Sequence, residues 1–359
     1  MQFEFLAIAN LRCLELTEFT PATGVNLVCG GNGSGKTSLL EGFAVASLGR
    51  SFLSNTVTDI VRTGSDGLAV RARVRDPAQG RAFAVQVRKL RGETQIRLDG
   101  ETVQAASALA RAIPTLVMNS KAADMLTENP ANRRALIDRT MFHVEQGYVD
   151  SWKGYRQALR QRNELLRQGA QPRDVAYWDE QLVELGTRID DRRRAVVAAM
   201  ERALAASSLN AVLGELSIRY NPGWDRERGL LAQLRAGWER DCQAGYTTAG
   251  IHRADLSIRC AGRGVARRIS RGQGKLLVAT LYVGLGRFIA DETGRVPVFL
   301  VDDLHAELDD NMCRQAVDII TALGGQSIFT AIRPSDLPAV TERTADVFHV
   351  EHHHRASPA

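Results

Sequence analysis

A short glycine-rich segment near the amino terminus carries the strongest chemical signal in the sequence. It reads GGNGSGKT and fits the pattern G-x-x-x-x-G-K-[ST]. An alternating apolar stretch precedes it and a stretch with helical spacing follows it, which is the context of a phosphate-binding loop. Glycines let successive N–H groups turn toward a phosphate, and the helix start adds positive potential. The expected nucleotide-binding residues are Gly30, Gly31, Asn32, Gly33, Ser34, Gly35, Lys36, Thr37 and Ser38.

Two side chains of this loop are expected to act on the nucleotide directly. Lys36 would reach the terminal phosphates and take part in catalysis, and the hydroxyl of Thr37 would bind Mg²⁺. The alternative is a glycine-rich turn without a ligand, and the strand–loop–helix context argues against it. The sequence therefore predicts ATP and Mg²⁺ as cofactors.

A pair of carboxylates follows an apolar run far downstream. The run VFLV ends in Asp302 and Asp303, and a buried strand that delivers a carboxylate at its carboxyl end is the Mg²⁺-binding arrangement of P-loop ATPases. We expect Asp302 to hold Mg²⁺ and Asp303 to orient or activate the attacking water as a catalytic residue. Alone, the run could also be a turn at the end of a strand. The phosphate loop upstream favours the metal site.

The segment ISRGQGKLLVATL begins at Ile269 and resembles the LSGGQ signature of ABC-type ATPases. A serine hydroxyl and the free N–H groups of a helix start can hold a γ-phosphate. In that class the motif faces the nucleotide of a second subunit. Ser270, Gly272 and Gln273 are therefore expected to bind the ATP of a partner copy. The alternative is a capped helix start without a ligand.

Several further blocks occur in the order found in one family. They are GGNGSGKTSLLEG, LGRSF, ANRRALIDRTMFH, YRQALRQRNELLR, HRADL, ISRGQGKLLVATL and FLVDDLHAELD. The sequence is similar to the RecF family of bacterial DNA-repair ATPases, which are relatives of SMC-type heads. The resemblance implies ATP-dependent homodimerisation, slow hydrolysis that acts as a switch, and binding to single-stranded, gapped or junction DNA. It also implies RecR and RecO as partners in loading recombinase, and roles in replication restart and the SOS response.

The resemblance also assigns single positions and shows departures. Arg12 matches an early arginine of the family. Asn119 and Ser120 stand at the metal-contacting Q-loop, where the family usually has an acidic residue. Thr330 stands where ABC transporters place a switch histidine. Asp303 replaces the usual ABC glutamate, and its shorter side chain would hold water less firmly, in agreement with slow hydrolysis.

Periodicity predicts an α/β fold: an ABC-type P-loop ATPase head, with a mixed sheet and helices, and an inserted α-helical arm. Alternation over 67–99 indicates an antiparallel hairpin or meander, and helical spacing over 148–169 and 174–208 indicates a helical hairpin. We expect the head in residues 1–125 and 213–359 and the arm in residues 126–212. The arm is either an ordinary helical subdomain or a projection that contacts a partner.

Charge and composition limit the partners and the compartment. The net charge of +5 permits a polyanionic partner, and residues 253–275 hold seven Lys or Arg and one Asp. Two further basic groups are Arg133, Arg134 and Arg139, and Arg192, Arg193 and Arg194. Each group could also be a solvated face. Because no base-reading motif is evident, we expect salt-sensitive, structure-selective DNA binding.

Five scattered cysteines without a CxxC pair indicate a reduced, intracellular chain without structural zinc. The amino terminus lacks signal-peptide features, and the apolar runs are too short to span a bilayer, so we expect a cytoplasmic protein that does not enter the membrane. Two other function classes are the alternatives. The motor of an ABC transporter would need a membrane-domain docking surface and a switch histidine, and neither is visible. A P-loop metabolic kinase would have no use for the Ser270 segment.

Overall fold

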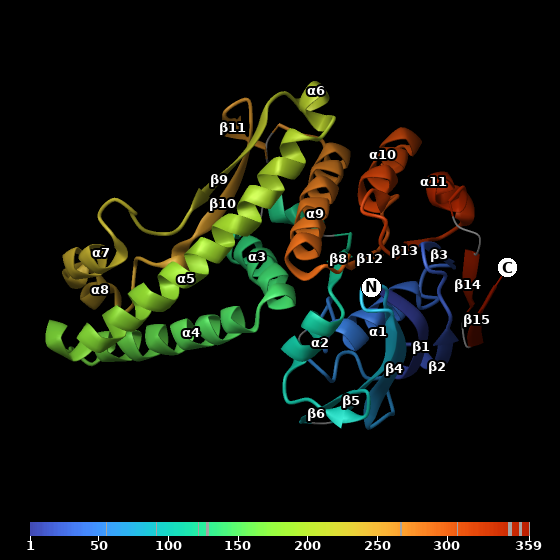
Figure 1. Ribbon diagram of the computed structural model, residues 1–359, viewed down its shortest axis with the longest axis horizontal. Coiled ribbons are helices and arrows are strands. Elements are labelled where there is room, and N and C mark those ends of the chain that lie inside the picture. The colour runs from blue at the N-terminus through green and yellow to red at the C-terminus, as the bar shows by residue number, and fades with distance from the viewer. Residues whose placement is uncertain are drawn as a thin grey trace. The chain divides into compact units, whose positions relative to one another are not determined.

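The computed structural model describes residues 1–54, 56–90, 92–120, 122–126, 129–265, 268–306, 308–343, 347–351 and 354–358. The chain divides into two compact units (Figure 1). We call Met1–Ala123 with Ile269–Ala359 the head, and Asp124–Arg268 the arm.

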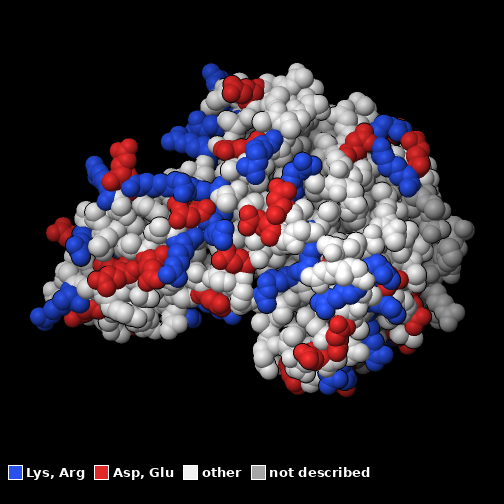
Figure 2. All heavy atoms as spheres, viewed as in Figure 1, with Lys and Arg blue, Asp and Glu red and all other residues white. Residues whose placement is uncertain are grey.

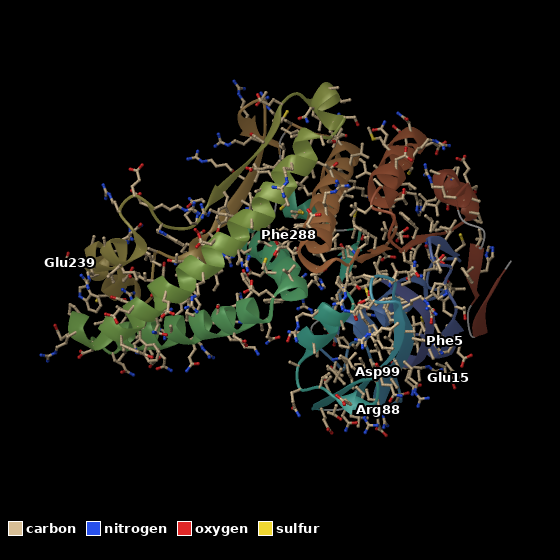
Figure 3. The ribbon with its side chains drawn as sticks, in the orientation of Figure 1. Phe5, Glu15, Arg88, Asp99, Glu239 and Phe288 are labelled. Carbon is tan, nitrogen blue, oxygen red and sulfur yellow. The ribbon has the colours of Figure 1, made fainter. Side chains whose placement is uncertain are left out.

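The first sheet of the head is antiparallel and has the strand order β2-β1-β4-β5-β6-β7. Its strands are β1 (Gln2–Leu11), β2 (Leu14–Phe19), β4 (Gly67–Asp76), β5 (Arg81–Leu90), β6 (Glu93–Leu98) and β7 (Glu101–Thr102). Buried and exposed residues alternate along β4, which is typical of a sheet with one solvated face. The antiparallel hairpin or meander predicted over 67–99 is confirmed, in the form of a meander, by the pairing of β4 with β5 and of β5 with β6. Figure 3 labels Arg88 on β5 and Asp99 in the turn after β6.

The second sheet of the head has the strand order β15-β14-β3-β13-β12-β8. Its strands are β3 (Val25–Cys29), β8 (Thr115–Met118), β12 (Val298–Val301), β13 (Ser327–Ala331), β14 (Val347–Glu351) and β15 (His354–Pro358). All neighbours from β14 to β8 are parallel, and β14 pairs with β15 antiparallel. Every residue of β12 and β13 is buried, as in parallel strands covered on both faces. The carboxyl ends of β3, β8, β12 and β13 therefore share one edge.

The helices of the head are α1 (Lys36–Leu48), α2 (Ala106–Ala112), α9 (Arg271–Thr293), α10 (Asp310–Thr321) and α11 (Pro338–Thr341), with a short 3₁₀ turn at Pro334–Asp336. A further 3₁₀ turn at Ala122–Leu126 spans the boundary between the two units. Helices α1, α9 and α11 contact strands of the second sheet. Helix α1 contacts strands of both sheets and is apolar nearly all round, as expected for an enclosed helix. Helix α9 is similarly buried, and its Phe288 (Figure 3) is one of the core residues.

The arm contains a long helical hairpin, as the periodicity predicted. Its elements are α3 (Pro130–Val144), α4 (Gln146–Arg167), α5 (Pro172–Ala205), α6 (Leu209–Leu213), β9 (Leu216–Asn221), α7 (Leu230–Ala236), α8 (Trp238–Ala244), a 3₁₀ turn at Ile251–Arg253, β10 (Asp255–Cys260) and β11 (Arg263–Gly264). Gly169 adopts φ 74° where α4 ends, which favours glycine at this helix end. Helices α7 and α8 contact α5 and α4, and Figure 3 labels Glu239 on α8.

The expected domain boundaries need one correction. Residues 213–268 were expected to belong to the head, but they pack in the arm. Strands β9 and β10 pair antiparallel, and their buried residues include Ile218 and Ile258. Helix α5 packs on β9, so the apolar face of this small sheet is covered by the arm's own helix. The alternation predicted the strands correctly but could not indicate which unit would cover them.

Candidate functional site

The glycine-rich segment joins β3 to α1 and is held in a conformation that requires glycine. Gly33 and Gly35 have φ values of 78° and 109°, which L side chains rarely adopt. A Cβ at Gly30 would lie 2.5 Å from both Ser34 Oγ and the carbonyl oxygen of Val350. A Cβ at Gly35 would lie 2.8 Å from Leu14 Cδ2. The loop can therefore follow this path only with glycine at these positions.

Two side chains of the loop have the arrangement of a site that receives phosphate. Lys36 Nζ donates to the carbonyl oxygens of Gly30 and Gly31 at 2.8 and 2.9 Å, so its charge is held across the loop. Ser34 Oγ is buried and has no hydrogen-bond partner within the part of the chain that the structure describes. A buried hydroxyl without a partner is costly, and a phosphate oxygen would satisfy it.

Asp302 and Thr37 meet at the edge where β12 and β3 end. Thr37 Oγ1 lies 3.1 Å from each carboxylate oxygen of Asp302, although the two residues are far apart in the chain. Asp302 is only 6% exposed. Burial and the nearby charge of Asp303 raise the pKa of Asp302, while hydrogen bonds from Thr330 and Thr37 oppose that rise. A hydroxyl and a carboxylate side by side are hard oxygen ligands, so this edge fits Mg²⁺.

Thr330 binds both aspartates at the end of β12. Its hydroxyl donates to Asp302 Oδ1 at 2.8 Å and accepts from the N–H of Asp303 at 3.0 Å. Asp303 has φ 50°, so the chain turns sharply after Asp302 and leaves Asp303 partly exposed. The N–H of Asp302 donates to the carbonyl oxygen of Met118, which ends β8. Asn119 and Ser120 therefore follow β8 at the same edge as the two aspartates.

The segment around Ser270 that resembles the LSGGQ signature forms the start of α9, which begins at Arg271. Ser270 Oγ accepts from the N–H of Gln273 at 3.2 Å, and Gln273 Oε1 accepts from the N–H of Ser270 at 3.0 Å. This reciprocal pair is a capping box. Ser270 is exposed and Gly272 is buried. No hydrogen bond among the described residues joins Ser270, Gly272 or Gln273 to the glycine-rich loop of the same chain.

The capped helix start is also connected to the loop after Asp303. Lys275 is buried in α9 and its ammonium group donates to the carbonyl oxygen of Ala306. Asp309, further along the same loop, caps α10 by accepting from the N–H of Met312 at 2.7 Å. The signature helix and the segment that follows the two aspartates are thus in direct contact within the head.

Sequence reasoning identified Arg12 but missed its partner, Glu41. The guanidinium of Arg12 forms an ion pair with Glu41, which is fully buried in α1, and the second hydrogen bond of the pair measures 3.0 Å. The hydrogen bond to Glu41 raises the pKa of Arg12. The hydroxyl of Ser51 also donates to Glu41. An acidic residue in an otherwise apolar helix was the signal that could have revealed this pair.

Two of the expected basic groups need correction, because several of their arginines are committed to ion pairs within the arm. Arg193 is 2% exposed, and its Nε and Nη2 donate to both oxygens of Asp138 at 2.8 and 2.9 Å. Burial disfavours its charge, but Asp138 outweighs burial and raises the pKa of Arg193. Arg133 pairs with Asp255, and Arg134 donates to the carbonyl oxygen of Ala254 at 2.7 Å. These side chains hold the arm together and are not a free basic surface.

Two further features of the described residues concern membrane insertion and metal binding. Of the helices within the described ranges, none combines the length and apolar character that crossing a bilayer requires. Within the same ranges, no group of three His, Cys, Asp or Glu side chains is arranged to hold a metal ion. A Mg²⁺ ion at Thr37 and Asp302 needs no such group, because Mg²⁺ in nucleotide sites takes few protein ligands together with phosphate oxygens and water.

Comparisons with known proteins agree on one family. Residues 3–356 match the family described as RecF/RecN/SMC N terminal domain. The chain is 37% identical to the DNA replication and repair protein RecF of Chromohalobacter salexigens, over 98% of each chain. It is 36% identical to the protein of the same name from Thioalkalivibrio sulfidiphilus, over 97% of each chain. A solved structure of the recombination mediator protein RecF with ATP superposes with a TM-score of 0.87 at 24% identity, over 99% of each chain. The predicted ABC-type head fold with its inserted arm is confirmed.

Proposed function

The chain belongs to the RecF family of DNA replication and repair proteins, and from this premise we propose that it is an ATP-dependent DNA-binding protein of recombinational repair and replication restart. The observation that supports the proposal is that Thr37 Oγ1 lies 3.1 Å from each carboxylate oxygen of Asp302. The adjoining glycine-rich loop contains the buried hydroxyl of Ser34, which has no hydrogen-bond partner among the described residues. Such an edge can bind a nucleoside triphosphate. The relatives named above give no support to the alternative of a transporter motor.

In this proposal the loop from Gly30 to Ser38 binds the phosphates of ATP through its N–H groups and through Lys36. Thr37 and Asp302 would hold Mg²⁺, which would supply charge neutralisation at the phosphate oxygens. Asp303 orients the attacking water, and its short side chain agrees with slow turnover. Hydrolysis ends the ATP-bound state and so limits how long the protein stays bound to DNA. The ATPase activity is weak and serves as a switch.

The second half of the ATP site comes from another copy of the chain. Ser270 is exposed at the start of α9, and Gly272 and Gln273 follow in its first turn. We assign these residues to the γ-phosphate of a partner's ATP, so that two heads close around shared nucleotide. A ligand that binds only the dimer stabilises the dimer by mass action, and hydrolysis releases it.

The biological output is DNA binding. The substrate class is single-stranded, gapped or junction DNA, bound through its phosphates and not read by sequence. RecR and RecO are the expected partners, because a solved relative is described as the recombination mediator of the RecFOR pathway. We further propose that the protein supports the SOS response and acts in the cytoplasm. Its nucleotide ligand is Mg²⁺-ATP.

Sedimentation velocity with and without ATP and Mg²⁺ tests the switch. The wild-type chain should change from monomer to dimer, and Lys36→Ala should stay monomeric because it loses nucleotide affinity. Lys153→Ala, on the exposed surface of α4, removes the same charge and should behave as wild type. Filter binding to single-stranded, duplex and gapped DNA, with and without ATP, tests the output. A wild-type chain that binds ATP but neither dimerises nor retains DNA would contradict the proposal.

A further inference from the structure

The small sheet of the arm exposes one polar face. Strands β9 and β10 pair with Arg219 opposite Ser257 and Ser217 opposite Arg259. Leu216, Ile218, Leu256 and Ile258 alternate with these residues and are buried on the other face. We call the outward residues Ser217, Arg219, Asn221, Asp255, Ser257 and Arg259 the arm sheet face. Because side chains alternate along a strand, all six lie on one side of the sheet.

A hollow of about 400 Å³ opens on this face. Its lining includes Arg219, Asn221, Ser257 and Arg259, so guanidinium, amide and hydroxyl groups border one space. The one carboxylate among the lining residues is Asp255. Arg133 Nε and Nη2 donate to its two oxygens at 2.9 and 3.2 Å, and the charge of Asp255 is therefore compensated from within the arm.

Arg219 and Arg259 differ from many other arginines on the arm surface. Arg188, Arg192 and Arg194 are each within 2.8 Å of a carboxylate oxygen. By contrast, neither Arg219 nor Arg259 has an ion-pair partner among the residues that the structure describes. Within the described ranges, the guanidinium of Arg259 donates only to the carbonyl oxygen of Gly262, at 3.3 Å. Figure 2 shows Lys and Arg side chains gathered where Figure 1 places β9 and β11.

The chemistry of the arm sheet face matches the backbone of a nucleic acid and not its bases. Arginine, serine and asparagine side chains are the usual donors to phosphate oxygens. Base stacking would need a free aromatic ring. Tyr220 also lines the hollow, but it is half-buried and its hydroxyl donates to Asp190 at 2.9 Å, so its side chain is held within the arm.

We propose that the arm sheet face binds the phosphate groups of a DNA backbone, with Arg219 and Arg259 as the charged contacts. This inference rests on the proposed DNA-binding function and adds to it the surface that makes the contact. Each phosphate that an arginine neutralises releases counterions from the DNA. For duplex DNA one such contact contributes about 0.9 to the magnitude of the slope of log K against log[salt], so the two arginines together should contribute about 2.

The test compares two double variants by fluorescence anisotropy with a labelled gapped duplex over a series of KCl concentrations. Arg219→Gln with Arg259→Gln should weaken binding about 10-fold or more and lower the slope of log K against log[KCl] by about 2. The matched control is Arg188→Gln with Arg194→Gln, which removes the same charge from ion-paired positions of the same unit. The control should keep the wild-type slope.

Each outcome decides the matter. Wild-type affinity and slope in the Arg219/Arg259 variant would overturn the assignment of this face while leaving the proposed function intact. An equal loss in the control would also overturn it, because the effect would then reflect total charge. A wild-type chain that binds no DNA would overturn the proposed function as well. If the double variant fails to dimerise with ATP, Ser257→Glu replaces it, since a carboxylate opposite Arg219 should repel phosphate and weaken binding similarly.

Discussion

Thr330 and Asp302 are joined by a hydrogen bond of 2.8 Å from the threonine hydroxyl to Oδ1 of the aspartate. Asp302 directly follows β12 and Thr330 lies near the end of β13, and these strands are parallel neighbours in which Val301 pairs with Phe329. The same hydroxyl accepts from the N–H of Asp303. A single side chain therefore fixes both the proposed Mg²⁺ ligand and the start of the turn that presents the proposed catalytic aspartate.

Thr330→Val should weaken ATP hydrolysis and shift its acid limit to higher pH. The hydrogen bond from Thr330 lowers the pKa of Asp302 against the effect of burial, so its loss raises that pKa and favours the protonated carboxyl. A hydrogen bond to a charged group contributes about 1.5–3 kcal/mol, which corresponds to about 10- to 100-fold in rate. The measurement is the pH profile of ATP hydrolysis at saturating Mg²⁺.

Thr330→Ser is the control for that experiment, because it keeps the hydroxyl and should restore most of the activity and the wild-type pH profile. A valine variant with an unchanged pH profile would show that Thr330 does not position Asp302.

Ser270→Arg should leave ATP binding intact and block ATP-dependent dimerisation, since a long side chain would fill the space assigned to a partner's γ-phosphate. Ser270→Asp is a sharper form of the test. Aspartate is as good a helix cap as serine, so α9 should keep its capping, whereas its charge would repel phosphate. Sedimentation with Mg²⁺-ATP measures both variants. Normal dimerisation of either one would refute the assignment of Ser270 to the partner's nucleotide.

Asp303→Asn should trap an ATP-bound dimer. Asparagine tolerates the positive φ of 50° at this position, so the turn should persist while the carboxylate is lost. Loss of a group that orients or activates water costs about 100-fold or more in hydrolysis. Single-turnover hydrolysis and dimer lifetime are the readouts, and Asp310→Asn, on the exposed start of α10, is the matched control. Rapid turnover in Asp303→Asn would exclude the assigned role.

Arg193→Met should destabilise the protein strongly, whereas Arg192→Met should not. Arg193 is buried against Asp138, and removing one partner of a buried ion pair costs about 3–5 kcal/mol because the other charge stays uncompensated. Arg192 pairs with Glu145 at the surface, where such a pair contributes about 0–1 kcal/mol. Urea unfolding of the full chain measures both. Equal stabilities would mean that the Arg193 pair is not desolvated as the structure shows.

The sequence by itself determined the local elements and the kinds of chemistry they carry. The glycine-rich loop, the apolar strand before Asp302 and the two arm helices are set by backbone sterics and by periods of two and 3.6 residues, which act between near neighbours. The capping of α9 by Ser270 is also a local feature, because it joins residues only three positions apart. The sequence offered this cap as an alternative to a ligand site.

Only the tertiary structure decided which distant residues meet and which charges are buried. Thr37 and Asp302 share an edge because β3, β13 and β12 are parallel neighbours. Arg193 is an internal ion-pair partner because α5 turns it toward Asp138, although its sequence neighbours are exposed. Residues 213–268 join the arm because α5 covers their apolar face. Burial and ion pairing depend on long-range packing, and a local pattern does not contain that information.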